Sequence, residues 1–591
     1  MRRRIPVLVV ALAVVSALVV ACGTSAPSRF GDAGLDATAH TGTEAGPVLG
    51  GKDGSSSLCT ICSSDMHAIL DCDGMVTSTC PADQGCTPEG ICVPACDAAR
   101  ANKSTIGCDY FDMAPVDFGG GRSCFATFIA NTWGAPVSIT VERAGKTYPV
   151  SSFAYVPQGS GTSLTYAPLT GDLPAGSIAI LFLSDSSNGA SCPKTPAVTG
   201  ASFTGTAIGK SFHISTSAPV VAYDIFPYGG GSSAIASASL LLPTSAWGDN
   251  YMSTTPAEQS VQSANPWIAI LAQENDTEVT LSPTVDITAS STIAGTGKGV
   301  PKTYTIQRGD ILKFQQPADL SGTPIQANKP IGVWGGNPCA NFPTGSSACD
   351  GMHQQLPPIK ALGHAYVAAR HRDRFEKTPE TAWWRFVGTV DGTQLTFDPP
   401  QPGAPAALSS GQVVLFEAGN SFVVTSQDDQ HPFYLAEYMT GCSTLKATGE
   451  CRGDPEFVNV IAPEQFLASY IFFTDPTYPT THLVFVRGKS KDGTFKDVDL
   501  DCIGNISGWK AVGTSGNYEY AYVDLVKGNF VPQGNCNNGR HESKSTGPFG
   551  ITVWGWGEKG TTIFSEAVSY AYPAGMSLKA INTVTVAPVP R

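Results

Sequence analysis

Short alternations of apolar and polar residues dominate the chain from about residue 109 onward. Strict period-two segments occur at 136–141, 277–281 and 393–397, and clusters of Gly, Pro, Ser and Asn separate such segments. Because successive side chains of a β-strand point to opposite faces of a sheet, this pattern predicts half-buried strands joined by turns. We therefore expect an all-β fold.

The strands recur in four units of about 110 residues. In each unit a proline leads an apolar strand, at Pro219, Pro330, Pro432 and Pro548. A second recurrent motif, or phrase, follows each of the first three prolines and ends on a tyrosine, at Tyr251, Tyr366 and Tyr470. Units of this length with about seven short strands are typical of β-sandwiches, each with its own core. The alternative is one β-propeller of smaller blades.

These patterns divide the chain into seven segments. Residues 23–58 hold almost no large apolar side chains and predict a flexible linker. The predicted organisation is a signal peptide at 1–21, a lipidated cysteine and linker at 22–58, a disulfide-rich module at 59–108, and β units at 109–255, 256–370, 371–475 and 476–591.

The N-terminus predicts export and lipidation. Three arginines precede an apolar run at 5–21 that ends at Cys22, which is the pattern of a signal peptide. Residues 19–22 resemble the lipobox of bacterial lipoproteins, in which the cysteine carries acyl chains that anchor the protein to a membrane. Gly23 is non-acidic, and this resembles lipoproteins of the bacterial outer membrane. We expect such a location, either surface-exposed or facing the periplasm.

The cysteine count agrees with an oxidising compartment. Of the 17 cysteines, 16 remain once Cys22 is set aside, and eight of them crowd into 59–108, where the connectivity stays open. Elsewhere the candidates for local disulfides are Cys124 with Cys192, Cys339 with Cys349, Cys442 with Cys451, and Cys502 with Cys536.

Charge and composition limit the classes of partner that the protein is expected to bind. The chain has 36 basic and 49 acidic residues, a net charge of −13, and only 14% charged residues. Nucleic acid is therefore not an expected partner, because phosphates attract basic surfaces.

Few residues point to chemistry. His-Glu-x-x-His and Gly-x-Ser-x-Gly sequences are absent, so we expect no enzyme and no cofactor. The exception is an alternation of Asp497, Asp499 and Asp501, whose carboxylates offer the oxygen ligands that calcium prefers. Two Arg-Gly-Asp tripeptides, at 308–310 and 452–454, are interpreted mainly as turns. The tryptophans at 383–384 and 554–556 are interpreted mainly as core residues, with a sugar-stacking platform as the alternative.

Four phrases, at 277–280, 319–323, 328–336 and 355–366, resemble the IgGFc-binding protein N-terminal domain family. The resemblance covers roughly residues 110–591 and implies a secreted or surface-exposed binding module. With the lipobox, it predicts a lipid-anchored, non-catalytic envelope protein for binding or adhesion, with a protein or glycan ligand. The alternatives are a structural or assembly component of the envelope, and a hydrolase with a site between repeats.

Overall fold

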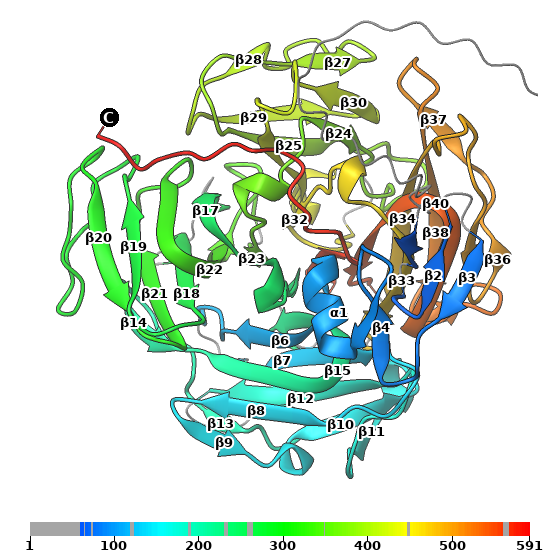
Figure 1. Ribbon diagram of the computed structural model, residues 1–591. Coiled ribbons are helices and arrows are strands. Elements are labelled where there is room, and N and C mark those ends of the chain that lie inside the picture. Colours follow the sequence, from blue (N-terminus) through cyan, green and yellow to red (C-terminus); the bar gives the residue numbers. More distant parts are fainter. Residues whose placement is uncertain are drawn as a thin grey trace, which may run out of the picture. The chain divides into compact units, whose positions relative to one another are not determined.

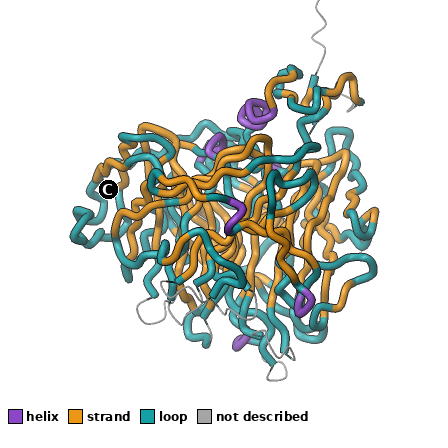
Figure 2. Tube along the Cα trace, turned by 90° about the horizontal axis from the view of Figure 1, so that it is seen from below, coloured by secondary structure: helices purple, strands orange, loops and turns teal. Residues whose placement is uncertain are grey.

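A computed structural model describes residues 60–590, except for 64, 72–74, 119–122, 187–190, 230–234, 257–263, 348, 446–449 and 560–565. Strands are the main regular structure of this part of the chain, with short helices between them (Figure 2). Residues Leu58–Arg591 form one compact unit. Cys22 and the predicted signal peptide lie outside the described residues. No helix of the described part is both long enough and apolar enough to span a membrane.

A small disulfide-rich module precedes the β units, as predicted. It contains the helix α1 (Ala95–Asn102) and the strands β1 (Ile61–Cys62), β2 (Ala68–Leu70), β3 (Val76–Thr79), β4 (Gln84–Cys86) and β5 (Cys92–Pro94). Three disulfides join Cys62 to Cys86, Cys80 to Cys92, and Cys96 to Cys108. Cys59 and Cys72 lie outside the described residues. Since short strands bury little apolar surface, covalent links stabilise this module.

The first sheet has ten strands (Figure 1). They are β6 (Ile106–Asp112), β7 (Phe125–Asn131), β8 (Ile139–Arg143), β9 (Lys146–Tyr148), β10 (Ala154–Gln158), β11 (Thr165–Pro168), β12 (Ile178–Asp185), β13 (Val198–Thr199), β15 (Phe212–Phe226) and β16 (Ser237–Leu240).

The second sheet has eight strands. They are β14 (Ala207–Lys210), β17 (Gly248–Met252), β18 (Trp267–Ala272), β19 (Thr277–Leu281), β20 (Lys302–Ile306), β21 (Asp310–Gln315), β22 (Pro324–Ala340) and β23 (Asp350–Gln355). Both β14 and β17 fall in the range predicted for the first unit, yet they pair with β21 and β22 of this sheet.

Three small sheets come next, and most of their strands lie in the range predicted for the third unit. One sheet contains β25 (Ala382–Gly388), β29 (Val413–Ala418), β31 (Phe433–Met439) and β32 (Glu456–Asn459). Another contains β24 (Ala365–Ala368), β27 (Thr396–Asp398) and β30 (Phe422–Thr425). The third pairs β26 (Thr393–Gln394) with β28 (Ala407–Leu408).

The fourth sheet has nine strands. They are β33 (Leu467–Thr474), β34 (Thr480–Gly488), β35 (Val498–Leu500), β36 (Gly504–Asn505), β37 (Lys510–Val512), β38 (Tyr518–Lys527), β39 (Val531–Pro532), β40 (Gly539–Trp556) and β41 (Ser569–Pro573). Connections between units contain the 3-10 turns η4 (Thr244–Ala246), η5 (Ile359–Ala361) and η7 (Pro463–Gln465).

The repeated proline marks the point where a long strand changes partners. In β15 the segment before Pro219 pairs with β8, and the segment after it pairs with β7. In β22 the residues before Pro330 pair with β19, and those after it pair with β18. Proline lacks the N–H that a continuous ladder needs, so it fits where pairing is interrupted. The long strands thereby curl each sheet into a half-barrel.

The repeated tyrosine fixes this bend. The Tyr251 hydroxyl accepts a hydrogen bond from the Gly248 N–H (3.0 Å) and donates to the Ile331 carbonyl (2.7 Å), directly after Pro330. The same pair of bonds recurs at Tyr366 and Tyr470, with the carbonyls of Phe433 and Phe549. No such tyrosine phrase precedes Pro219, and there Tyr110 donates to the Val220 carbonyl, directly after the proline.

The all-β repeat architecture is confirmed, whereas a closed propeller is not what the structure shows. The half-barrels differ in size, and the third is divided. The strand that follows each proline strand lies on the inner side: β16 contacts β23 and β41, and β32 contacts the same two strands. Of these four strands, β23 and β32 are labelled near the centre of Figure 1. The expectation of one core per unit is wrong, because the largest core cluster contains side chains of the first and fourth sheets together.

Candidate functional site

Four disulfides join the eight cysteines that the sequence analysis named outside the cysteine-rich module. Cys124 is bonded to Cys192, Cys339 to Cys349, Cys442 to Cys451, and Cys502 to Cys536. The second and third bonds close the connections from β22 to β23 and from β31 to β32. They therefore hold the inner strands at equivalent positions of consecutive units.

The acidic alternation at 497–501 brackets β35, and all three of its carboxylates are exposed. Asp501 lies 3.0 Å from the His541 Nδ1 atom and accepts the Glu542 N–H at 3.0 Å. Among the described residues, its carboxylate oxygens do not converge with those of Asp497 and Asp499 to within 4.8 Å. Calcium binding at these residues stays a prediction, and thermal unfolding with and without calcium would test it.

Two other groups of potential metal ligands are close together in the described residues, at Cys442, Cys451 and Asp454, and at Asp501, Cys502 and His541. In both groups the cysteines are in disulfides. A disulfide sulfur is not a thiolate, so these groups do not have the donor set of a metal centre.

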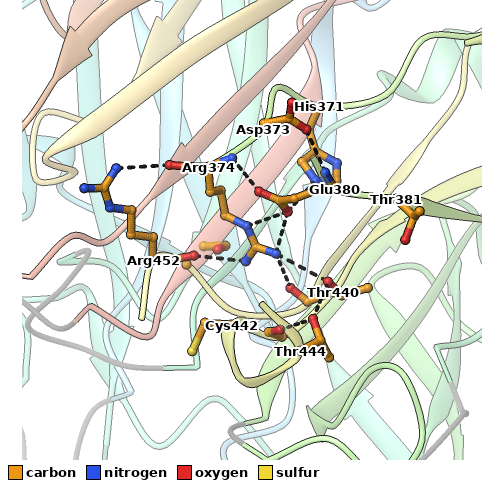
Figure 3. A network of polar contacts seen from close by, with 12 residues as sticks. His371, Asp373, Arg374, Glu380, Thr381, Thr440, Cys442, Thr444 and Arg452 are labelled. Atoms are coloured by element: carbon orange, nitrogen blue, oxygen red, sulfur yellow. Dashed lines mark hydrogen bonds and ion pairs between the residues drawn. The ribbon is translucent and has the colours of Figure 1, made fainter. Parts of the chain in front are cut away.

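A network of buried charges surrounds Arg374, in the connection between β24 and β25 (Figure 3). Its Nε atom donates to Glu380 Oε2 at 2.9 Å, and its Nη2 atom lies 2.8 Å from the same oxygen. The Nη1 and Nη2 atoms also donate to the carbonyls of Arg452 (2.9 Å) and Thr440 (2.8 Å). All three nitrogens of the guanidinium thus contact acceptors of the protein itself.

His371 extends this network. Its Nδ1 atom lies 2.8 Å from Glu437 and its Nε2 atom 3.4 Å from Glu380, and the histidine is fully buried. Burial opposes protonation, but the two carboxylates outweigh it and raise the pKa of His371. Burial likewise opposes ionisation of Glu380, yet Arg374 and His371 hold its pKa well below the usual range.

The network also connects the third unit to the fourth. The Arg372 N–H donates to His482 Nε2 at 3.2 Å, and its guanidinium pairs with Asp524 of β38. Because burial and neighbouring cations lower the pKa of His482, this ring is a neutral acceptor. We conclude that these charges position two units against each other and are not open to a substrate.

A second set of buried acids lies near the inner strands. Asp350 and Glu456 are fully buried and Asp454 nearly so, and burial raises the pKa of all three, to about 7 for Asp454. Their partners are local: the Ser569 N–H donates to Asp350 at 3.0 Å, and the Ser237 hydroxyl to Glu456 at 3.1 Å. These acids could not be recognised from the sequence, because a single carboxylate in an apolar strand resembles one on a solvated face.

The Arg-Gly-Asp tripeptides do not present an arginine and an aspartate together. Asp310 is buried and pairs with Lys210, while Arg308 is exposed in the turn before it. Asp454 of the second tripeptide is buried as well. Three of the four named tryptophans are buried, at 384, 554 and 556, so their interpretation as core residues is confirmed.

These features define a disulfide-stapled all-β repeat protein whose buried charges stabilise the contacts between its units. The IgGFc-binding protein family matches residues 237–555, more than half of the chain. The chain belongs to this family. Over 356 residues it is 24% identical to the IgGFc-binding protein of Homo sapiens. The aligned region covers 58% of this chain and 6% of the human protein. The match thus spans a small fraction of that relative's length. No solved structure matches the chain.

Proposed function

We propose that the protein is a lipid-anchored, non-catalytic binding or adhesion protein of the bacterial cell envelope. The observation that carries this proposal is the family match over 237–555, which begins at the first inner strand and ends within β40. The human relative is named for binding IgG Fc. For this chain we correspondingly propose a protein or glycan ligand.

The arrangement of functional groups supports binding over catalysis. The best candidates for acid–base chemistry are His371, Glu380 and Asp350, and all are buried and hydrogen-bonded within the protein. A general acid or base must reach the substrate directly or through one water molecule. The exposed loops on a rigid β scaffold are, in contrast, suited to ligand contact.

The anchor is proposed from Cys22 and the preceding apolar run. Metabolic labelling with a fatty-acid analogue tests it: we expect label on the wild-type chain and none on Cys22→Ser. A labelled Cys22→Ser variant, or an unlabelled wild type, would contradict the anchor without touching the proposed binding function.

The binding function is tested with the purified, oxidised chain on arrays of glycans and proteins that include human IgG Fc. We expect reproducible binding to a restricted set of ligands that is lost when the disulfides are reduced. Failure to bind any arrayed ligand would overturn the proposal, and turnover of a glycoside, peptide or ester substrate would favour the hydrolase alternative.

A further inference from the structure

A polar groove with a cavity volume of about 200 Å³ lies where α1, β6, η4 and the turn between β20 and β21 meet. Its lining includes Arg100, Asp109, Thr244, Ser245, Gln273 and Arg308. This groove combines the disulfide-rich module with the first two sheets, since the Cys96–Cys108 bond is part of its wall.

Arg308 is held in place without a carboxylate partner. Its Nη2 atom lies 3.2 and 3.4 Å from the two ring nitrogens of His213, and its guanidinium carbon is 5.3 Å from the centre of the Phe111 ring. Being almost equally close to both nitrogens, the guanidinium lies over the imidazole. Among the described residues, no carboxylate oxygen comes within 4.0 Å of its nitrogens.

The nearby carboxylates are occupied by His213 itself. Its Nε2 atom lies 3.0 Å from Asp109 and its Nδ1 atom 3.2 Å from Glu142, and only 10% of its side chain is exposed. Asp109 also accepts the Thr244 hydroxyl at 3.2 Å. The imidazole and the Phe111 ring, 4.7 Å apart, therefore form a fixed platform for Arg308. A planar guanidinium that is already ordered loses little conformational entropy when it binds an anion.

We propose that this groove binds the carboxylate of an acidic sugar, with Arg308 as the residue that recognises it. A guanidinium pairs with a carboxylate through two parallel hydrogen bonds. Thr244, Ser245 and Gln273 supply the hydroxyl and amide groups that suit sugar hydroxyls. A peptide ligand is disfavoured, because its anchors are apolar or aromatic side chains and this lining is mainly polar. The inference rests on the proposed binding function and names its ligand class.

The test uses the purified, oxidised full chain and isothermal titration with 3′-sialyllactose, lactose and sodium acetate. We expect 3′-sialyllactose to bind at least about tenfold more tightly than lactose or acetate, since only the acidic sugar offers both the carboxylate and the hydroxyls. Arg308→Ala should weaken binding by about tenfold or more, and Arg308→Lys by less, because lysine keeps the charge but not the planar group.

Two further variants make the result specific. Ser245→Trp keeps every charge but fills the groove, so we expect it to abolish binding. Arg540→Ala removes a half-buried arginine that pairs with Glu542 outside the groove, and binding should be unchanged. Equal affinity for lactose, or binding that survives both Arg308→Ala and Ser245→Trp, would overturn the site. If the array detects other ligands but no acidic sugar, the groove assignment fails while the binding function stands. If the array detects none, both fail.

Discussion

Asp475 gives a prediction in which a substitution stabilises the protein at one pH and not at another. It is 2% exposed, and its Oδ1 atom accepts the N–H (2.8 Å) and the hydroxyl (2.7 Å) of Thr477. Burial raises the pKa of its carboxyl to about 6, from an ordinary value of 3.8. The folded protein therefore favours the neutral carboxyl, whereas in the unfolded chain the carboxyl loses its proton at a pH about two units lower.

The sign of the pH dependence follows from this difference. Below pH 3.8 the carboxyl is neutral in both states, and its favourable contribution is fully present. As the pH rises through about 6 the contribution is lost, and the loss amounts to about 3 kcal/mol because one pKa unit corresponds to about 1.4 kcal/mol. Asp475→Asn retains a neutral group of the same shape at every pH.

We expect Asp475→Asn to match the wild type near pH 4 and to be the more stable protein at pH 8. If the unit Leu58–Arg591 unfolds cooperatively, a gain of about 3 kcal/mol raises Tm by about 3 °C, given an unfolding entropy of about 2 cal/mol/K per residue. Scanning calorimetry from pH 4 to 8 measures this, with the exposed Asp249→Asn as control. A gap between variant and wild type that does not change with pH would refute the reasoning.

Three further predictions address the scaffold. Arg374→Met removes one of the two cations that compensate the buried Glu380 and leaves only His371, so it should destabilise the protein by about 3–5 kcal/mol in denaturant unfolding. A loss below about 1 kcal/mol would show that the pair is dispensable. Tyr366→Phe removes both hydrogen bonds of the bend and should cost about 1–3 kcal/mol in the same assay, and an unchanged unfolding midpoint would contradict a role in the bend. Replacing Cys124 and Cys192 by serine removes a bond that links residues 68 apart in sequence and should cost about 4 kcal/mol relative to the oxidised wild type in the same assay. A cost below about 1 kcal/mol would contradict a stabilising role for this disulfide.

The sequence predicted the repeat because its recurrent residues have fixed backbone roles. Pro219 and Pro330 occupy the interruption of a long strand, and Tyr251 and Tyr366 hydrogen-bond to the residue after the next proline. Each role depends on the spacing of residues close together in the sequence, so the repeat can be recognised from a single sequence.

The contacts between units could not be predicted in the same way. Arg372 and His482 are 110 residues apart, and Tyr223 donates to the Ala574 carbonyl across 351 residues. Neither pair leaves a local pattern in the sequence. The shared core of the first and fourth sheets follows from such contacts, which explains why separate cores were wrongly expected. The groove at Arg308 was hidden for the same reason, because its platform comes from β6 and β15.

The most direct test of a surface-anchored binding protein is protease shaving of intact cells, followed by immunodetection of residues 109–591. We expect the region to be removed from intact cells, while a periplasmic marker stays protected. Protection of both, with removal only after the outer membrane is permeabilised, would contradict an outward-facing binding protein.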